Sequence, residues 1–555
     1  MLFLSPSQGN IAGSLALHRC ARRSHVPGVV ADSLDFAAWP RPGDRFKGGS
    51  VVHLSDSTLR ACGRRAGVPT QDRSRLRHSV VHIGVGGFHR AHQAVYLDSL
   101  LRTGETGWGE IGVGLHSPAM KQALAPQDCL FTVVERDATG DSIRIVGSIC
   151  GYLFAPDDPE AVLRALASPR TRVVSLTVTG GGYNLDAHGR FRADAADVSH
   201  DVRSPAQPRT WFGYLVAALE RRHTAGLPGF TVLSCDNVAD NGRAARTAVL
   251  SFARLRDERL ADWIDRNVTF PESLVDRITP QTNDALRTLV KKRWGIKDRW
   301  PVATERYSEW VVEDEFCNGR PDLERVGGRF VSDVSPYKLV KTRMLNGAHT
   351  AMAYLGQLAG YRTPAEVMAN STFAAFLELM LTDEIQPCLP LVPSLDLATY
   401  RASVLERLAN PRVGDTIERL CERGSTKVPG YLLPSLAAAR RSGHPAPLLT
   451  LAVAGWFRFL RGRDAAGRSF DVVDPRRESL QRLARLGGTD PGPLLAERGV
   501  MGDLGDDGLT RQGLEQALRR LDRGGPLAAV RREVERAGVG VRLEVATPVE
   551  ARIGA

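Results

Sequence analysis

A short apolar run that passes directly into glycines restricts the fold of this chain more than any other feature. The run is Ser79-Val-Val-His-Ile-Gly84-Val-Gly86-Gly87-Phe-His89-Arg-Ala-His92, and a helical pattern follows at 94–101. Dinucleotide-binding proteins need this order of strand, turn and helix, because Gly84 permits a tight turn and Gly86 lets the backbone approach a pyrophosphate. The fingerprint is incomplete, since His89 stands where a third glycine belongs. A plain strand-turn-helix is therefore an equal alternative.

Further apolar segments favour an open α/β sheet around this motif. Helical stretches separate several of them, and they lie at 110–115, 131–134, 173–178 and 230–233. The strand that ends at Leu115 should be followed by an acid that holds the ribose hydroxyls of NAD, but His116-Ser117-Pro118 follows instead. We expect NAD as the cofactor and keep NADP as an alternative, because His116 and Ser117 would tolerate a 2′-phosphate.

A second informative stretch, 335–349, contains Lys341, Asn346 and His349. If it is helical, a rotation of about 100° per residue makes the three side chains project from one side. A lysine, an amide and an imidazole together suit proton removal from an alcohol, with donors for the resulting oxyanion. Lys338 lies within the same arc, where it would lower the pKa of Lys341 or bind a carboxylate on the substrate. The alternative is a solvated helix face.

The composition excludes several classes of protein. At 555 residues the chain predicts two or three domains. Its net charge of +11 is dispersed, with no basic run interleaved with aromatics, so we expect no nucleic-acid partner. No apolar run is long enough for a membrane span. The eight cysteines are scattered without metal-ligand spacing, which indicates a metal-free, cytoplasmic protein.

Four motifs in order resemble those of the mannitol dehydrogenase family, the long-chain polyol dehydrogenases. They are the glycine-rich segment above, Ser234-Cys-Asp-Asn237, Val275-Asp276-Arg-Ile-Thr-Pro280, and Lys341 with Asn346 and His349. The likeness extends from about residue 54 to about residue 474. It implies a Rossmann-type NAD(P)-binding domain followed by a mainly α-helical domain, with the active site in the cleft between them and no metal.

The resemblance also implies roles for individual residues. Lys341 would be the general base, Asn237 and Asn346 would hold the alkoxide-like oxygen, and His349 would position the substrate oxygen. Three residues match positions that bind the remaining polyol hydroxyls: Asp276, Arg419 and Lys427. The cofactor would lie against the glycine-rich segment, which comprises Gly84, Val85, Gly86, Gly87, Phe88, His89 and Arg90.

Each of these assignments has a structural alternative. Asp276 could pair with Arg277 at the surface, and Asn237 could cap a helix. Arg419 and Lys427 could lie on a solvated helix end and loop. Two positions also depart from the family, because glycine (Gly180) and lysine (Lys338) stand where members often have glutamates that serve proton exit.

We therefore predict three segments: a disordered extension at 1–50, a dinucleotide-binding domain at 51–330 and a helical substrate domain at 331–545. The expected reaction is NAD(P)-dependent oxidation of D-mannitol to D-fructose by a monomer. Fructuronate reduction, which Lys338 would favour, and arabinitol oxidation are the alternatives. A nucleotide-binding protein without catalysis is disfavoured, because a pure binder has no use for a buried base.

Overall fold

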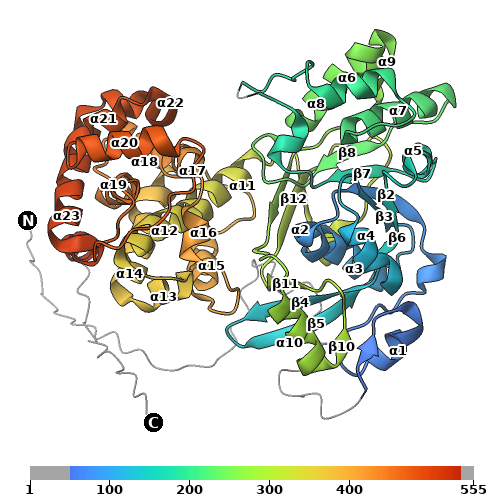
Figure 1. Ribbon diagram of the computed structural model, residues 1–555, viewed down its shortest axis with the longest axis horizontal. Helices are drawn as coiled ribbons and strands as arrows, with labels where there is room; N and C mark the ends of the chain where they lie inside the picture. Colours follow the sequence, from blue (N-terminus) through green and yellow to red (C-terminus); the bar gives the residue numbers. More distant parts are fainter. Residues whose placement is uncertain (1–49, 187, 539–555) are drawn as a thin grey trace, which may run out of the picture.

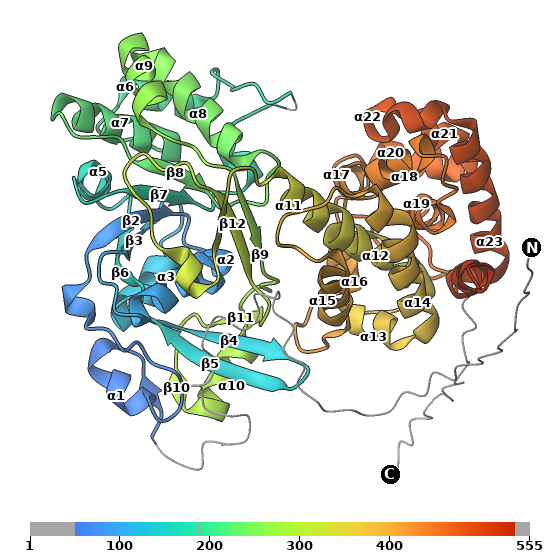
Figure 2. The same cartoon turned by 180° about the vertical axis from the view of Figure 1, so that it is seen from behind.

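The computed structural model describes residues 50–186 and 188–538. The chain folds into a part built on sheets and a helical part beside it, as Figures 1 and 2 show from opposite sides. The expected α/β domain followed by a helical domain is confirmed. The extension predicted at 1–50 lies outside the described residues, apart from Ser50, and so does the end of the predicted helical domain from residue 539.

The first part is organised around a five-stranded, wholly parallel sheet. Its order is β6 (Ile149–Phe154), β3 (Gly109–Gly114), β2 (His78–Ile83), β7 (Val173–Leu176) and β8 (Thr231–Ser234). Three of the four apolar segments named in the sequence match β3, β7 and β8 to within a few residues. The fourth, at 131–134, forms β4 (Phe131–Asp137), which lies in a separate sheet and not in the main one as expected. Because the strands are parallel, the ends of β2, β7 and β8 meet at one edge, where ligands bind in such sheets.

Alternation along β2 explains why both faces of this sheet are covered. Val81 and Ile83 pack against one set of helices, and Val80 packs on the opposite face with Leu97 and Leu100. A strand buried on both faces is typical of parallel sheets. The first face is covered by α5 (Pro159–Ala167), α7 (Trp211–Thr224) and α8 (Asn241–Arg256), and the second by α3 (Gln93–Arg102).

Two three-stranded sheets extend from this core. One has the order β11 (Val302–Glu305), β4 (Phe131–Asp137), β5 (Gly140–Val146), and the other β13 (Arg329–Val331), β12 (Glu309–Glu313), β9 (Ser273–Asp276). The remaining elements of this part are β1 (Val52–His53), α1 (Leu59–Cys62), α2 (Gly87–Ala91), α4 (Ala119–Leu124), α6 (Ala196–Arg203), α9 (Glu258–Asn267), α10 (Asp284–Trp294) and β10 (Ile296–Lys297).

The helical part begins with α11 (Ser335–Val340), which lies at the junction of the two parts in both views (Figures 1 and 2). A π-helical turn, Lys341–Asn346, joins it to α12 (Gly347–Ala359). The other helices are α13 (Pro364–Ala369), α14 (Ser371–Leu379), α15 (Leu397–Ala409), α16 (Ile417–Cys421), α17 (Gly424–Tyr431), α18 (Leu433–Arg441), α19 (Pro447–Phe459), α20 (Arg477–Gly487), α21 (Gly492–Leu495), α22 (Arg498–Met501) and α23 (Gly508–Arg536).

Local residues set the boundaries between two pairs of consecutive helices. α13 ends before Asn370, whose side chain accepts hydrogen bonds from Thr372 N and Phe373 N and so begins α14. A turn separates α18 from α19, which opens with Pro447. No helix among the described residues is long and apolar enough to cross a membrane.

Candidate active site

A cavity of about 530 Å³ lies where the carboxyl edge of the main sheet faces the helical part. From the sheet part it is lined by the glycine turn after β2 and by the segments that follow β7, β8 and β9. From the helical part it is lined by the π turn, α12 and the 415–431 segment. The predicted site residues that line it are Gly84, Gly86, Gly87, Phe88, His89, Asn237, Asp276, Lys341, Asn346, His349, Arg419 and Lys427.

The glycine turn has the geometry that its sequence predicts. Gly84 has φ +98°, and a Cβ atom there would lie 2.2 Å from the carbonyl oxygen of Thr177. No other residue type fits, because both the backbone angle and the approach of β7 exclude a side chain. Gly86 differs, since a Cβ atom would meet only Gly84 O at 3.7 Å within the protein. The bare Gly86 therefore leaves space open on the cavity side.

The ammonium group of Lys341 is held between two strand ends. Lys341 Nζ donates to Val275 O at 2.8 Å and to Asn237 Oδ1 at 3.2 Å. Burial lowers the pKa of Lys341, and the negative charge of Asp276 opposes this shift. Burial also lowers the pKa of His349, to about 4, with Arg407 acting in the same direction. The imidazole is therefore neutral at physiological pH.

The π turn differs from the ideal helix assumed from the sequence. Its hydrogen bonds close over five residues instead of four, and such turns occur frequently at functional sites. Lys341 and Asn346 are five residues apart and are the first and last residues of this turn. Both line the cavity together with His349. The expected shared direction of these side chains assumed about 100° of rotation per residue, and the wider π turn does not keep that rotation.

Asp276 is neither a surface residue nor a partner of Arg277. Its carboxylate accepts two hydrogen bonds from Arg407, at 2.8 and 3.0 Å, while Arg277 pairs with Glu135. Arg407 also donates to Glu305, at 2.8 and 2.9 Å. Burial alone would raise the pKa of Asp276, but Arg407 and then Lys341 outweigh it, so this pKa lies below its ordinary value.

Arg419 and Lys427 both line the cavity, where Lys427 is half-buried and the side chain of Arg419 is still 60% exposed. Arg419 Nε donates to Asp415 Oδ1 at 2.6 Å, and this pairing raises the pKa of the guanidinium group. Lys427 Nζ donates to Leu420 O at 3.1 Å. Burial lowers the pKa of Lys427, and the charge of Arg419 contributes to the shift.

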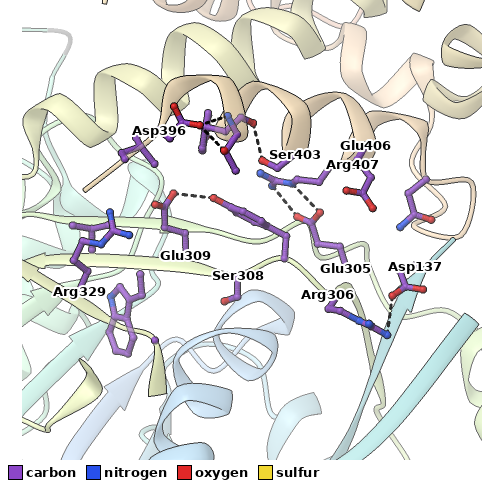
Figure 3. Close-up of a pocket in the computed structure, with 18 of the residues that line it drawn as sticks. Asp137, Glu305, Arg306, Ser308, Glu309, Arg329, Asp396, Ser403, Glu406 and Arg407 are labelled. Carbon is purple, nitrogen blue, oxygen red and sulfur yellow. Dashed lines mark hydrogen bonds and ion pairs between the residues drawn. The ribbon is translucent and has the colours of Figure 1, made fainter. Parts of the chain in front are cut away.

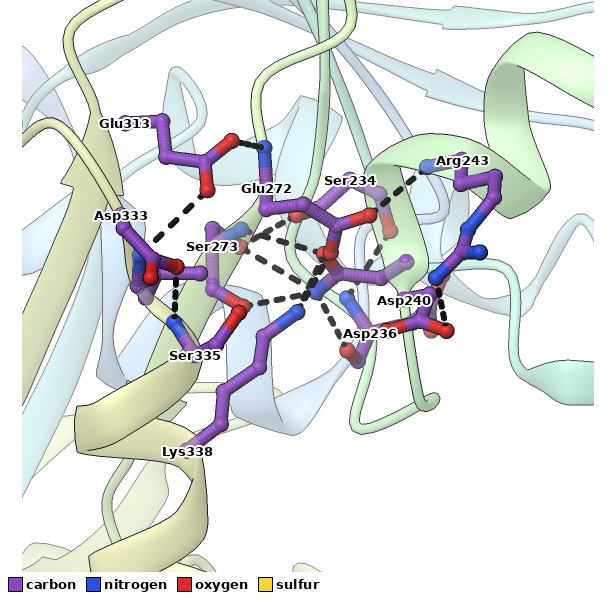
Figure 4. Close-up of polar contacts among 12 residues, drawn as sticks. Ser234, Asp236, Asp240, Arg243, Glu272, Ser273, Glu313, Asp333, Ser335 and Lys338 are labelled. Carbon is purple, nitrogen blue, oxygen red and sulfur yellow. Dashed lines mark hydrogen bonds and ion pairs between the residues drawn. The ribbon is translucent and has the colours of Figure 1, made fainter. Parts of the chain in front are cut away.

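Lys338 does not line the cavity, in contrast to its expected place on the active arc. Its ammonium group forms an ion pair with Glu272 and donates to Asn241 Oδ1 at 3.3 Å (Figure 4). Glu272 also accepts from the backbone N–H of Arg243 at 2.9 Å. The pairing links α11 to the sheet part and neutralises the lysine charge. Lys338 is the last and smallest of the influences that lower the pKa of Lys341.

Two residues of the glycine-rich segment also lie away from the cavity. Val85 is buried in an apolar cluster behind the turn. Arg90 is fully buried, and its guanidinium group donates to Trp300 O and Gly86 O and lies over the ring of Phe131. Arg90 therefore stabilises the turn from behind.

His89, which replaces the third glycine of the fingerprint, is fully buried. Its ring stacks on His82 with centroids 3.5 Å apart, and its Nε2 lies 2.8 Å from Glu110 Oε1. Burial lowers the pKa of His89 to about 3, so the ring is neutral.

The sequence did not identify three polar groups that shape the site: Asp236, Arg407 and Asp415. Asp236 accepts hydrogen bonds from Val178 N, Thr179 N and Tyr183 Oη, and so ties the end of β8 to the loop after β7. Arg407 is 131 residues from Asp276, and no local pattern indicates their contact. The pairing of Asp415 with Arg419 has the i, i+4 spacing of a helix and could have been found from the sequence.

Comparison with known proteins is consistent with this geometry. Residues 78–325 match the model of the mannitol dehydrogenase Rossmann domain, and residues 333–522 match that of the mannitol dehydrogenase C-terminal domain. The mannitol 2-dehydrogenase of Aspergillus fumigatus is 44% identical over 455 residues, which cover 80% of this chain and 90% of that protein. Mannitol dehydrogenase 2 of Saccharomyces cerevisiae is 43% identical over 452 residues, with 80% and 90% coverage.

Solved structures show the same similarity. The mannitol 2-dehydrogenase of Pseudomonas fluorescens, in ternary complex with NAD and D-mannitol, superposes with a TM-score of 0.77 at 39% identity over 87% of this chain and all of that one. A D-sorbitol dehydrogenase in substrate-free form superposes with a TM-score of 0.81 at 34% identity, covering 86% of this chain and all of that one. The chain belongs to the mannitol dehydrogenase family.

Proposed function

We propose that the protein is a polyol dehydrogenase that oxidises D-mannitol at C2 to D-fructose with NAD. The observation that carries the proposal is the position of Lys341, a lysine with a lowered pKa in the same cavity as the glycine turn. A relative that matches most of this chain was solved with NAD and D-mannitol.

The residues at the glycine turn fit a dinucleotide. Gly86 and Gly87 line the cavity without side chains, and the first turn of α2 begins there with backbone N–H groups that lack helical acceptors. These groups would hold the pyrophosphate, and the bound nicotinamide would accept the hydride. The end of β3 presents no carboxylate at Leu115 or His116. NAD is the proposed cofactor on the strength of the relative, and NADP is the alternative to test.

Lys341 would remove the proton of the C2 hydroxyl. A lysine accepts a proton only in its neutral form, and burial increases the neutral fraction by lowering its pKa. As the hydroxyl proton passes to Nζ, the C2 hydrogen leaves as hydride and C2 becomes a carbonyl. Lys341 supplies the base from the protein itself, so we propose that no metal takes part. Treatment with EDTA should leave the activity unchanged.

Three neutral side chains would hold the reacting oxygen. Asn237 Oδ1 already accepts from Lys341, which leaves the amide N–H groups of Asn237 to donate to an alkoxide-like oxygen. Asn346 and His349 line the same cavity from the π turn and α12. His349 can donate from a ring nitrogen in its neutral form, and it then orients the oxygen without adding charge.

The remaining hydroxyls of the substrate would bind to Asp276, Arg419 and Lys427, which line the cavity. Arg407 fixes the carboxylate of Asp276 through two hydrogen bonds, so this acceptor is already oriented before substrate binds. The charges of Arg419 and Lys427 suit hydroxyl oxygens as acceptors. Lys338, the residue expected to favour a hexuronate, is paired with Glu272 and does not line the cavity.

The test follows the absorbance of the reduced nicotinamide. The purified protein is assayed with D-mannitol, arabinitol and mannonate in the oxidative direction, and with fructose and fructuronate in the reductive direction, each with both nicotinamide cofactors. We expect kcat/KM to be highest for D-mannitol and fructose with NAD and NADH. A higher kcat/KM for mannonate and fructuronate would contradict the proposed substrate. Nucleotide binding without turnover of any compound would contradict the proposed activity.

A further inference from the structure

A second cavity, of about 390 Å³, lies between the two parts of the chain. The proposed polyol oxidation does not use it. The sheet part contributes the β11–β12 connection and the β4–β5 turn, and the helical part contributes α15 (Figure 3). The volume is that of a small-molecule site, and such sites occur preferentially at domain interfaces. Its aromatic walls come from Tyr96, Tyr307, Trp310 and Tyr400.

The charge of the lining is negative. The lining has five carboxylates (Asp137, Glu305, Glu309, Asp396 and Glu406) and three guanidinium groups (Arg306, Arg329 and Arg407). Arg306 is paired with Asp137. Arg407 pairs both with Glu305 and with Asp276, and Asp276 lines the candidate active site. The cavity as a whole therefore has more negative than positive charge.

Glu309 differs from the exposed Asp396 and Glu406 in being largely withdrawn from solvent. Within residues 50–186 and 188–538 no cation lies at ion-pair distance from it, and its contact is with the hydroxyl of Tyr307, at 3.1 Å (Figure 3). Burial raises the pKa of Glu309, and the charge of Asp276 raises it further. Arg329 lowers it without pairing. A carboxylate beside aromatic faces attracts an organic cation both by its charge and by cation–π interaction.

The same cavity also has buried donors without acceptors. Trp310 and Tyr400 are each only 4% exposed, and neither Trp310 Nε1 nor Tyr400 Oη has a hydrogen-bond partner among the described residues. Arg329 Nη1 is in the same state. Burial and nearby carboxylates raise the pKa of Tyr400 well above its ordinary value, so its hydroxyl stays protonated. Buried donors without partners are costly, and oxygen atoms on a ligand would satisfy them.

We propose that this cavity binds a small protonated amine that also has hydroxyl or ether oxygens, the chemistry of amino alcohols and amino sugars. The ammonium group would lie near Glu309 among the aromatic rings, and the oxygens would accept from Tyr400 and Trp310. A neutral sugar of the same size lacks the charge, and a simple alkylamine lacks the oxygens. Both should bind more weakly.

Calorimetric titration of the full chain, without nicotinamide or polyol, tests the proposal directly. The probes are D-glucosamine and ethanolamine, with D-glucose and N-acetyl-D-glucosamine as neutral controls, at a pH where the amines are protonated. We expect saturable binding of at least one amine and at least tenfold weaker binding of the neutral sugars. Absence of saturation with either amine, or equal binding of the neutral sugars, would overturn the proposal.

Variants locate the site. Glu309→Gln and Tyr400→Phe keep the shape of the cavity and should each weaken amine binding at least tenfold. Glu324→Gln, a surface carboxylate paired with Arg320, should leave it unchanged. If either cavity variant fails to fold, Ser403→Phe narrows the cavity from α15 and should abolish binding. Binding that survives every folded cavity variant would place the amine elsewhere and refute the assignment.

Discussion

Lys341 Nζ lies 3.2 Å from Asn237 Oδ1, although the two residues are 104 positions apart and come from different parts of the fold. Asn237 follows β8 at the edge of the parallel sheet, and Lys341 opens the π turn of the helical part. In this contact Lys341 Nζ donates to the amide oxygen of Asn237, beside the glycine turn. The proposed chemistry depends on this contact.

The proposed base makes a prediction about pH. Because burial lowers the pKa of Lys341 from 10.5, kcat/KM for polyol oxidation should rise with pH and reach a plateau with a midpoint below 10.5. The charge of Asp276 raises this pKa, so Asp276→Asn should move the midpoint to lower pH while reducing kcat/KM. Asp314→Asn, at a surface ion pair with Arg320, is the matched control and should not shift it. A midpoint that stays in place in Asp276→Asn would argue against Lys341 as the titrating group.

The buried pairing of Arg407 predicts a large loss of stability. Arg407→Ala leaves Asp276 and Glu305 buried without their cation, which should cost about 3–5 kcal/mol of unfolding free energy. Arg164→Ala removes an exposed arginine that lies near the exposed carboxylates of Asp158 and Glu160, and it should cost only about 0–1 kcal/mol. Urea denaturation at neutral pH measures both. Equal losses of unfolding free energy in the two variants would contradict the claim that the buried pairing contributes more to stability than an exposed one.

The same pairing has a pH dependence with a definite sign. Arg407 holds the pKa of Asp276 below its unfolded value, so the stabilisation is present above that unfolded value and is lost as pH falls through the folded pKa. The difference in unfolding free energy between the wild type and Arg407→Ala should therefore shrink on acidification below about pH 4. A constant difference over this range would show that the pairing is not the cause.

The glycine turn predicts a change that affects the cofactor and spares the fold. In Gly86→Ala the new Cβ atom meets only Gly84 O at 3.7 Å within the protein but occupies the space proposed for the pyrophosphate. We expect at least tenfold weaker NAD binding, measured by nicotinamide fluorescence or calorimetry, with a melting temperature close to that of the wild type. Gly107→Ala, where nothing lies within 4 Å of the Cβ position, is the control and should bind NAD normally.

The place of Lys338 gives a test of substrate class. Because its ammonium group is paired with Glu272 and does not line the cavity, Lys338→Gln should leave the ratio of kcat/KM for fructose and fructuronate within about twofold of the wild-type ratio. A marked loss of fructuronate activity alone would show that Lys338 reaches the substrate. That result would favour fructuronate reduction over mannitol oxidation as the function.

Local patterns in the sequence predicted the fold, and the family resemblance indicated many of the residues that line the cavity. The strand before Gly84, the helix after it and the later strands each have a hydrophobic period or a turn residue that acts over a few positions. The Lys341 segment was correctly expected to be helical. Its π turn could not be foreseen, because no residue in it signals closure over five positions instead of four.

The contacts that the sequence missed are those between distant segments. Nothing near Asp276 in the chain indicates Arg407, and nothing near Lys338 indicates Glu272, because each pairing depends on how the helical part packs against the sheets. Lys338 was predicted to face the site from its helical angle alone. In the structure its ammonium group pairs with Glu272 instead. Arg90 was assigned to the cofactor by its position in the motif, but its side chain turns back to Trp300 O.

The most direct test of the central claim compares Lys341→Ala with the wild type in two measurements on the same preparation. Stopped-flow absorbance gives the rate of nicotinamide reduction by D-mannitol, and calorimetry gives the Kd for NAD. We expect the rate to fall at least a thousandfold, with the Kd for NAD changed by less than about threefold. A rate within tenfold of the wild type would contradict the role of Lys341 as the base. Equal losses of rate and NAD affinity would mean that this lysine serves the nucleotide instead.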